Sequence, residues 1–240
     1  MSENKNAELG KELVGSWAIH ALFQQGVLRD GIRLGMGTGT TVKYVIESLF
    51  YLWKDERFKD IAVVPTSSDT FFKCRSFGIP TYSLDSKRVA GHLDLCIDGA
   101  DRYDKDNNLI KGGGGALFKE KIVAYNSDVF VVVAEDRKKV ESLNCDFPVP
   151  IEVLPFAYKA VCLALEQRGL TFELRALSDE NPYITENGNY IIDAHYPKDL
   201  DISPEREEIE LNKIVGVVEN GFFNKRKVKR VFSTSEIDEE

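Results

Sequence analysis

The stretch "GIRLGMGTGTT", residues 31–41, is a short apolar run that ends in alternating glycines and threonines. Three further apolar runs also end in small, hydroxyl or charged residues: "IAVVP" at 61–65, "LDLCID" at 93–98 and "DVFVVVAE" at 128–135. Helix-length segments lie between them, among them "TVKYVIESLFYLWKDE" at 41–56 and "DTFFKCRSFG" at 69–78. Apolar strands that alternate with amphipathic helices predict βαβ units and a parallel sheet. The predicted fold class is therefore α/β, with a Rossmann-like parallel sheet.

A helix is expected before the first strand. The segment "ELGKELVGSWAIHALF", residues 8–23, places four apolar residues near one helix face: Leu9, Leu13, Trp17 and Leu22. In a parallel sheet the ligand lies beyond the carboxyl ends of the strands. Those ends carry glycine, hydroxyl or charged residues here, so the sequence predicts a site at that edge.

The pattern changes after "CDFPVPIEVLP", residues 145–155, where three prolines indicate a boundary. A small α+β unit follows, with helices predicted at 157–170 and 203–217, a strand at 171–177 and a hairpin at 183–196 around Asn187-Gly188, a preferred type I′ pair. Ser203 and Pro204 are expected to start the second helix. The final "GFFNKRKVKRVFS", 221–233, could return to the first sheet. The predicted domains are 1–147 with 221–240, and 148–220.

Composition limits the function classes. The chain has 240 residues and a net charge of −8, which argues against a nucleic-acid or anionic-membrane partner. No stretch approaches the length of a membrane span, and the first residues lack the apolar centre of a signal peptide, so a cytoplasmic location is expected. The cysteines Cys74, Cys96, Cys145 and Cys162 form no CxxC pair, which favours buried free thiols over disulfides or a zinc site.

The loop "GMGTGTT" predicts an anion site. Backbone amides and hydroxyls at the start of a helix attract anions. The dinucleotide pattern fails because Gly35, Gly37 and Gly39 have the wrong spacing, and a P-loop lysine is absent. The prediction that survives is a cup for one phosphate, with Thr38, Gly39, Thr40 and Thr41 as donors. The alternative is a glycine turn that serves only tight packing of strand against helix.

The segment "DGADRYDKDNN" begins with two aspartates, Asp98 and Asp101, at the end of an apolar strand. Asp98 directly follows the apolar "LDLCI", and Asp101 comes three residues later, so both are candidate site residues. The alternative is a pair of aspartates that only caps the loop. A calcium loop beginning at Asp104 fails because its sixth and twelfth positions lack the required glycine and glutamate. A solvated turn is predicted instead, formed by Asp104, Asp106, Asn107 and Asn108.

The segment "IKGGGGALFKEKIVA", 110–124, is typical of a loop that leads into a helix. The glycine amides can stabilise a developing oxyanion, and Lys111 adds a positive charge. Glu120 lies on one helix face with Ala116 and Ala124, while Lys119 and Lys121 are expected to point to either side. The alternative for Glu120 is an exposed residue paired with a lysine. No histidine falls in these motifs, so an acid–base enzyme here would use a carboxylate.

Together, "GMGTGTT", "TSSD", "DGAD", "KGGGGAL", "KEK", "PVPIEVLP" and "ITENGN" resemble the type A ribose-5-phosphate isomerase family. The resemblance implies interconversion of D-ribose 5-phosphate and D-ribulose 5-phosphate in the non-oxidative pentose phosphate pathway, without metal or other cofactor. It implies a homodimer or homotetramer whose small domain is a ferredoxin-like lid or oligomerisation unit. By motif, Glu120 would be the proton-transfer base, with Asp98, Asp101 and Lys111 at the sugar oxygens. The implied substrate contacts are Thr38, Gly39, Thr40, Thr41, Asp98, Gly99, Ala100, Asp101, Lys111, Gly112, Gly113, Gly114 and Lys138.

This sequence departs from the family pattern at a few positions. Arg102 replaces an acid, Gly115 replaces an alanine, and "EDRK" varies the run before Lys138. Two other functions remain open. A non-catalytic sugar-phosphate sensor would need a DNA-binding domain, for which the first 30 or so residues are too few and too acidic. An aminosugar-phosphate deaminase of related fold would be expected to use a histidine for ring opening.

Overall fold

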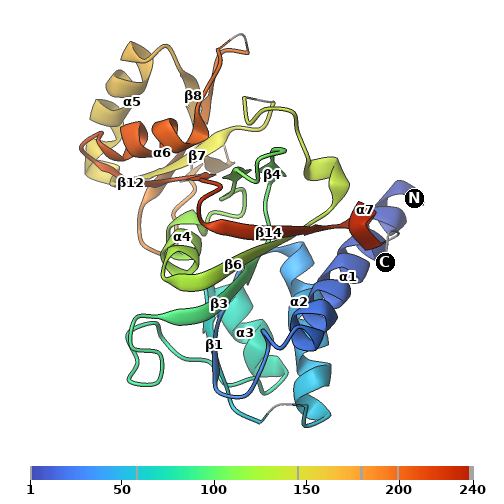
Figure 1. The fold of residues 1–240 in the computed structure, drawn as a ribbon. Helices are drawn as coiled ribbons and strands as arrows, with labels where there is room; N and C mark the ends of the chain where they lie inside the picture. Colours follow the sequence, from blue (N-terminus) through green and yellow to red (C-terminus); the bar gives the residue numbers. More distant parts are fainter. Residues whose placement is uncertain (1, 58, 145, 179–180, 199, 238–240) are drawn as a thin grey trace. The chain divides into compact units, whose positions relative to one another are not determined.

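The structure is a computed structural model that describes residues 2–57, 59–144, 146–178, 181–198 and 200–237. The chain divides into two compact units (Figure 1). The first unit comprises Met1–Ala100, Lys119–Lys138 and Lys227–Glu240. The second comprises Asp101–Phe118 and Lys139–Arg226.

The first unit is built on a five-stranded parallel sheet in the order β14-β6-β3-β1-β2. The α/β fold class and the return of the C-terminal strand to this sheet are therefore confirmed. The elements of this unit are α1 (Ser2–Gln24), β1 (Ile32–Met36), α2 (Thr40–Lys54), β2 (Ile61–Pro65), α3 (Ser68–Ser76), β3 (Leu93–Asp98), α4 (Leu117–Tyr125, which begins in the second unit), β6 (Ser127–Ala134), the 3-10 turn η1 (Asp136–Lys138), β14 (Val228–Ser233) and α7 (Thr234–Ile237).

Alternate residues of β1 face different helices. Leu34 and Met36 are fully buried in the core formed with α1 and α2, two helices that lie side by side in Figure 1. Gly35 lies between them on the strand and faces the other way, where a Cβ would come within 2.4 Å of Val123 on α4. The glycine therefore lets α4 approach the sheet closely.

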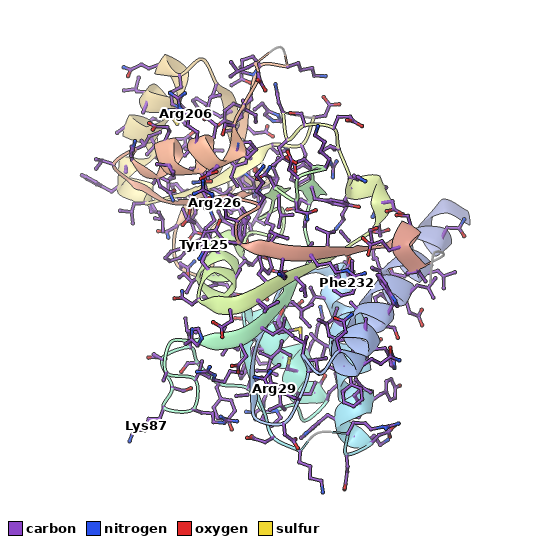
Figure 2. The ribbon with its side chains drawn as sticks, in the orientation of Figure 1. Arg29, Lys87, Tyr125, Arg206, Arg226 and Phe232 are labelled. Atoms are coloured by element: carbon purple, nitrogen blue, oxygen red, sulfur yellow. The ribbon has the colours of Figure 1, made fainter. Side chains whose placement is uncertain are left out.

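Helix α1 buries only part of the predicted stripe, at Trp17 and Leu22. Leu9 and Leu13 are 53% and 48% exposed, whereas Val14, Ala18 and Leu22 are buried. Residues 14, 18 and 22 share one face at i, i+4 spacing, so this face, one residue further on, packs into the core. Trp17 is partly buried and meets Phe232 of β14, which is labelled in Figure 2, edge to face with ring centroids 4.9 Å apart.

The second unit holds a four-stranded antiparallel sheet in the order β12-β7-β11-β8. With its two longer helices it follows the chain order β-α-β-β-α-β, which is the ferredoxin-like arrangement. Its elements are β4 (Arg102–Tyr103), β5 (Leu109–Ile110), β7 (Val149–Val153), the 3-10 turn η2 (Pro155–Ala157), α5 (Tyr158–Gln167), β8 (Thr171–Leu174), β9 (Ala176–Ser178), β10 (Asn181–Pro182), β11 (Tyr190–His195), α6 (Pro204–Asn212), β12 (Val217–Asn220) and β13 (Phe222–Phe223).

One apolar core joins the helices of the second unit to this sheet. Val161 and Leu165 of α5 and Leu211 of α6 pack with Ile151 and Ile192 of the central strands. Smaller sheets add β13-β5-β4 and β10-β9. The predicted small domain, 148–220, falls within this unit, whose later segment is longer (Lys139–Arg226) and which also includes Asp101–Phe118.

The predicted hairpin at 183–196 is wrong. Strand β11 pairs with β7 and β8, and the segment before it forms only a turn, in which the Thr185 N–H donates to the Asn189 carbonyl at 2.9 Å. Gly188 has a φ of 80°, but Asn187 does not have the positive φ that a type I′ turn requires at both central residues. The turn is shaped instead by buried Glu152, whose Oε1 accepts hydrogen bonds from the side chains of Thr185, Asn187 and Asn189.

The turn after Asp104 is present but is not solvated throughout. Asp104 and Asn108 are only 8% and 5% exposed. The Asp104 carboxylate accepts from the Asp106 N–H at 2.9 Å and from the Asn108 N–H at 2.8 Å, so it organises the turn from within. Burial follows because these bonds replace water around the carboxylate.

The prediction of free buried thiols is confirmed for Cys74, Cys96 and Cys162. Burial raises the pKa of the Cys74 thiol to about 12 and also raises that of Cys162. Cys145 lies outside the described residues. None of the helices in the described part of the chain is long and apolar enough to cross a membrane.

Candidate active site

The loop after β1 has the geometry of an anion site. Gly39 is the N-cap of α2 and provides no side-chain cap, so the amides of the first turn are left for another acceptor. Gly39 and Thr40 are exposed. Thr41 is 3% exposed, and its hydroxyl oxygen has no hydrogen-bond partner among the described residues. A phosphate at this helix start would find amide and hydroxyl donors.

Thr38 is already engaged within the first unit. Its N–H donates to Asp98 Oδ1 at 3.1 Å, and its hydroxyl lies 2.8 Å from the hydroxyls of both Thr66 and Ser67. Thr70, on α3, joins this hydroxyl cluster and donates to the Gly37 carbonyl at 2.7 Å. The cluster ties the "TGTT" loop to the "TSSD" segment, whose side chains were not singled out from the sequence.

Asp98 ends β3 and is fully buried. Its Oδ1 accepts from the Gly99 N–H at 2.7 Å as well as from Thr38. A Cβ on Gly37 would lie 1.9 Å from this oxygen, so the glycine is required where the carboxylate packs on the backbone. Asp98 therefore does more than cap its own loop: it joins the ends of β1 and β3.

Lys138 lies at the same end of the sheet. It ends the short turn η1 after β6, and its Nζ donates to the Ala100 carbonyl at 2.7 Å. The structure thus brings Lys138 to the loop of Asp98, Gly99 and Ala100, although about 40 residues separate them in the sequence. These contacts are all made within the first unit.

Glu120 lies in the first turn of α4 and is 4% exposed. This burial contradicts the alternative of an exposed helix residue. Lys121 is also buried, at 3% exposure, with its Nζ 5.7 Å from the centroid of the ring of Tyr125, which is labelled in Figure 2. Helix α4 packs closely on the sheet at Val123, which explains why its polar residues can be covered.

Asp101 and the glycine loop meet within the second unit. Asp101 Oδ2 accepts from the Gly113 N–H at 2.7 Å. Arg102, the departure from the family pattern, donates to the Asp101 carbonyl at 2.7 Å and places its guanidinium 4.7 Å from the centroid of the Phe147 ring. The second aspartate of "DGAD" therefore holds the loop that begins after Lys111.

Lys111 is 2% exposed. Its N–H donates to the Gly221 carbonyl at 2.9 Å, and its Nζ lies 5.6 Å from the centroid of the Phe223 ring. A charge that is shielded from water exerts a stronger field than one in water. Lys111 is thus a buried cation at the start of the glycine loop.

The loop itself is a tight turn in which the Gly115 N–H donates to the Gly112 carbonyl at 2.9 Å. Gly113 and Gly114 are exposed, and a Cβ on Gly114 would meet no atom within 4 Å. Gly115 has a φ of +81°, and a Cβ there would lie 2.3 Å from the Tyr183 hydroxyl. The glycine that departs from the family pattern is therefore matched to Tyr183 in this chain.

Two of the three histidines are exposed. His20 is exposed, and the exposed His92 lies 3.1 Å from Asp128, as expected for histidines without a catalytic role. Within the described part of the chain, no group of three or more histidine, cysteine, aspartate or glutamate side chains is arranged to hold a metal ion.

The comparisons with known proteins agree on one family. The family model described as "Ribose 5-phosphate isomerase A (phosphoriboisomerase A)" matches residues 62–236. A ribose-5-phosphate isomerase A of Treponema denticola is 49% identical over 223 residues, which cover 92% of this chain and 93% of the relative. The chain belongs to the ribose-5-phosphate isomerase A family. A relative of the same name from Thermococcus kodakarensis is 43% identical, over 82% of this chain and 84% of its own.

Solved structures of this family share the fold. The ribose 5-phosphate isomerase A of Methanocaldococcus jannaschii has a TM-score of 0.83 at 35% identity and covers 96% of this chain and 95% of its own. A D-ribose-5-phosphate isomerase in complex with phospho-erythronic acid has a TM-score of 0.83 at 37% identity, covering 93% of this chain and 94% of its own. The predicted family membership is therefore confirmed.

Proposed function

We propose that this protein interconverts D-ribose 5-phosphate and D-ribulose 5-phosphate through an enediolate, in the non-oxidative pentose phosphate pathway. Membership of the ribose-5-phosphate isomerase A family supports the reaction. The observation that carries the assignment of the base is the burial of Glu120 at 4% exposure in the first turn of the helix that follows the glycine loop. Neither a sugar-phosphate sensor nor an aminosugar-phosphate deaminase is favoured by the relatives.

In the proposed mechanism, Glu120 carries a proton between C2 and C1 of the open-chain sugar. A single carboxylate suffices, because the proton returns to the carbon next to the one it left. Negative charge then develops on the two oxygens of the enediolate. Lys111 and the glycine amides would stabilise that charge, and the low exposure of Lys111 to water makes its interaction stronger.

Asp98 and Asp101 are proposed to move hydroxyl protons and to assist ring opening. Lys138 and the loop of Thr38, Gly39, Thr40 and Thr41 are proposed to bind the phosphate and sugar, together with Gly99, Ala100 and the backbone of Gly112, Gly113 and Gly114. The unpartnered hydroxyl of Thr41 supports this assignment. A phosphate held in this way positions the reacting carbons for the base.

Other predictions extend this proposal. We propose that the enzyme acts on a small sugar phosphate in the cytoplasm, that it works as a homodimer or homotetramer, and that residues 148–220 form a lid and oligomerisation domain. The net charge of −8 supports the absence of nucleic-acid and membrane partners.

The test compares Glu120→Gln with binding variants in an assay of ribulose 5-phosphate formation. Glu120→Gln keeps the shape of the side chain but removes the base, so kcat should fall about 10²- to 10⁴-fold. Thr38→Ala and Lys138→Ala should mainly raise KM, because the phosphate is held in the ground state and the transition state alike. The assay is run with and without chelator, and activity that requires an added divalent ion would contradict the proposed cofactor-free reaction.

Glu208→Gln is the matched control. Glu208 is another buried glutamate, 6% exposed on α6, and its Oε2 accepts from Asn224 in the second unit. Its replacement should leave kcat unchanged. Near-normal turnover by Glu120→Gln would refute Glu120 as the base and direct attention to Asp98 or Asp101.

A further inference from the structure

Arg175 is a residue outside the motifs that contacts the glycine loop. Its Nη1 donates to the Gly112 carbonyl at 2.8 Å and to the Gly113 carbonyl at 3.1 Å. Both carbonyls therefore point toward one guanidinium nitrogen. These contacts lie entirely within the second unit.

The guanidinium of Arg175 is itself fixed by Asp193 of β11. Nε donates to Asp193 Oδ2 at 2.8 Å, and Nη2 donates to Oδ1 at 2.5 Å. The two side chains are only 16% and 10% exposed. A bidentate arginine–carboxylate pair fixes the plane of the guanidinium, and Asp193 is anchored because β11 is paired with strands on both sides. The pair is thus a rigid support for the loop.

The direction of the carbonyls decides the direction of the amides. A peptide group is planar and trans, so its N–H points away from its carbonyl. The Gly113 N–H shares a peptide with the Gly112 carbonyl and donates to Asp101 Oδ2 on the side away from Arg175. The Gly114 N–H shares a peptide with the Gly113 carbonyl and must also point away from Arg175. No residue in the described part of the chain accepts a hydrogen bond from it.

We infer that Arg175, held by Asp193, is a positioning residue that aims the Gly113 and Gly114 amides for catalysis. One amide holds Asp101, and the other is presented to the oxyanion of the enediolate. The inference rests on the proposed function, because it assigns these amides a task in that reaction. Arg175 acts through the loop and contacts no reacting atom.

A loop of four glycines needs such a support. Glycine has more backbone freedom than any other residue, so "GGGG" would sample many orientations of its amides. Amides stabilise a transition state best when they are already aimed before the charge develops. The positive charge on Arg175 also polarises both peptide groups, which makes their N–H groups stronger donors.

The test uses two ligands that differ in one group. Phospho-erythronic acid, which is bound by a solved relative, carries a planar carboxylate, whereas erythritol 4-phosphate carries a hydroxymethyl group in its place. Both have the phosphate and the same carbon chain. Because only the acid mimics the enediolate oxygens, a loss of amide alignment should weaken binding of the acid and spare binding of the alcohol.

Arg175→Met should lower kcat about 10- to 100-fold, as expected when a catalytic group is displaced by a fraction of an ångström to one ångström. It should weaken the Kd of phospho-erythronic acid by about 10-fold or more, with the Kd of erythritol 4-phosphate and the KM changed by less than about 3-fold. Arg175→Lys should give intermediate values, because lysine keeps the charge but cannot bind the carboxylate and both carbonyls together.

Arg168→Met is the matched control, because Arg168 forms an ion pair with Glu207 at 2.5 Å in the same unit without contacting the glycine loop. It should leave kcat and both affinities unchanged. If Arg175→Met does not fold, Arg175→Lys and Asp193→Asn replace it in the same comparison. A lower melting temperature with unchanged kcat and an unchanged ratio of the two affinities would overturn the inference and leave Arg175 as a structural residue.

The wild-type enzyme separates the two possible failures. If wild-type protein forms ribulose 5-phosphate and Glu120→Gln does not, the proposed function stands, and an unaffected Arg175→Met refutes only the positioning role. If wild-type protein forms no ribulose 5-phosphate, the proposed function fails and the inference that rests on it fails too.

Discussion

Gly37→Ala provides the most direct test of how Asp98 is held. An added Cβ would lie 1.9 Å from Oδ1, 2.0 Å from Cγ and 2.5 Å from Cβ of Asp98. A change of rotamer could move the first two atoms, but the Asp98 Cβ is fixed to the backbone of β3. The substitution must therefore displace the end of β1 or of β3, and with it the carboxylate.

The expected cost follows from the contacts that the displacement breaks. Overpacking of a buried site costs about 1–3 kcal/mol. The carboxylate also accepts hydrogen bonds from the Thr38 and Gly99 N–H groups, and the loss of one bond to a charged group costs about 1.5–3 kcal/mol. The free energy of unfolding should therefore fall by about 3–6 kcal/mol. For a chain of this size, that corresponds to a decrease of roughly 6–24 °C in Tm.

The assay combines thermal or urea unfolding with steady-state kinetics. Displacement of Asp98 should lower kcat by about 10²-fold or more in the protein that remains folded. Gly99→Ala is the control for stability, because its Cβ would come no closer than 3.8 Å to the Val133 carbonyl and should cost less than about 1 kcal/mol. In an Asp98→Gly background, which removes all three clashing atoms, most of the cost of Gly37→Ala should disappear. A Gly37→Ala protein with unchanged stability and kcat would refute the packing of the carboxylate on Gly37.

Two further predictions concern carboxylates outside the site, one buried and one partly buried. Glu152 is fully buried and its Oε1 accepts three side-chain hydrogen bonds, so Glu152→Ala should lower the free energy of unfolding by about 3–5 kcal/mol. Glu152→Gln keeps an acceptor oxygen and should cost less; equal losses measured by urea unfolding would contradict this account. The hydrogen bonds from the Arg33 side chain hold the pKa of Asp94 below its usual value, so the pair adds stability above the usual aspartate pKa and loses it as pH falls through the lowered one. Asp94→Asn should cost about 1–3 kcal/mol at pH 7, and a cost that stays constant down to pH 2 would refute this assignment.

Much of the first unit could be predicted because its signals are local. The parallel strands β1, β2, β3 and β6 are buried apolar runs with polar ends, and all four lie at the predicted places. The strand expected to return at the C-terminus also forms, and it pairs with β6. The buried face of α1 was predicted correctly at Trp17 and Leu22 but not at Leu9 and Leu13, because two adjacent stripes of α1 carry apolar residues and packing against α2 selects between them.

The hairpin could not be predicted correctly, because its turn is governed by a residue that is distant in the sequence. Asn187-Gly188 is a strong local turn signal, and a turn does form there. Its geometry is set by Glu152, about 35 residues earlier, which draws Thr185, Asn187 and Asn189 toward one carboxylate oxygen. Strand β11 pairs with β7 and β8 rather than with the segment directly before the turn.

The sequence motifs predicted the residues of the candidate site but not the residues that hold its loops in place. Lys138 contacts Ala100, as expected for residues that follow the carboxyl ends of strands in one parallel sheet. Glu120 is buried. The hydroxyl cluster around Thr70 and the contact of Arg175 with the glycine loop were missed, since serine, threonine and arginine are common on surfaces and their partners lie far away along the chain. A residue that acts through backbone carbonyls leaves no motif of its own.

The burial of the charged candidates is an argument for their roles. Asp98, Lys111 and Glu120 are 0%, 2% and 4% exposed, whereas the loops proposed to bind the substrate, at Gly39, Thr40, Gly113 and Gly114, are exposed. For stability, burying an ionisable group is a cost of several kcal/mol unless hydrogen bonds compensate for it, as they do at Glu152 outside the site. Catalysis does gain, because a carboxylate that abstracts a proton and an ammonium that stabilises an oxyanion both act more strongly where water is excluded. In the sequence, exposed glycine and threonine loops thus alternate with buried charged residues. Catalysis on a small anion explains this pattern better than packing of the core does.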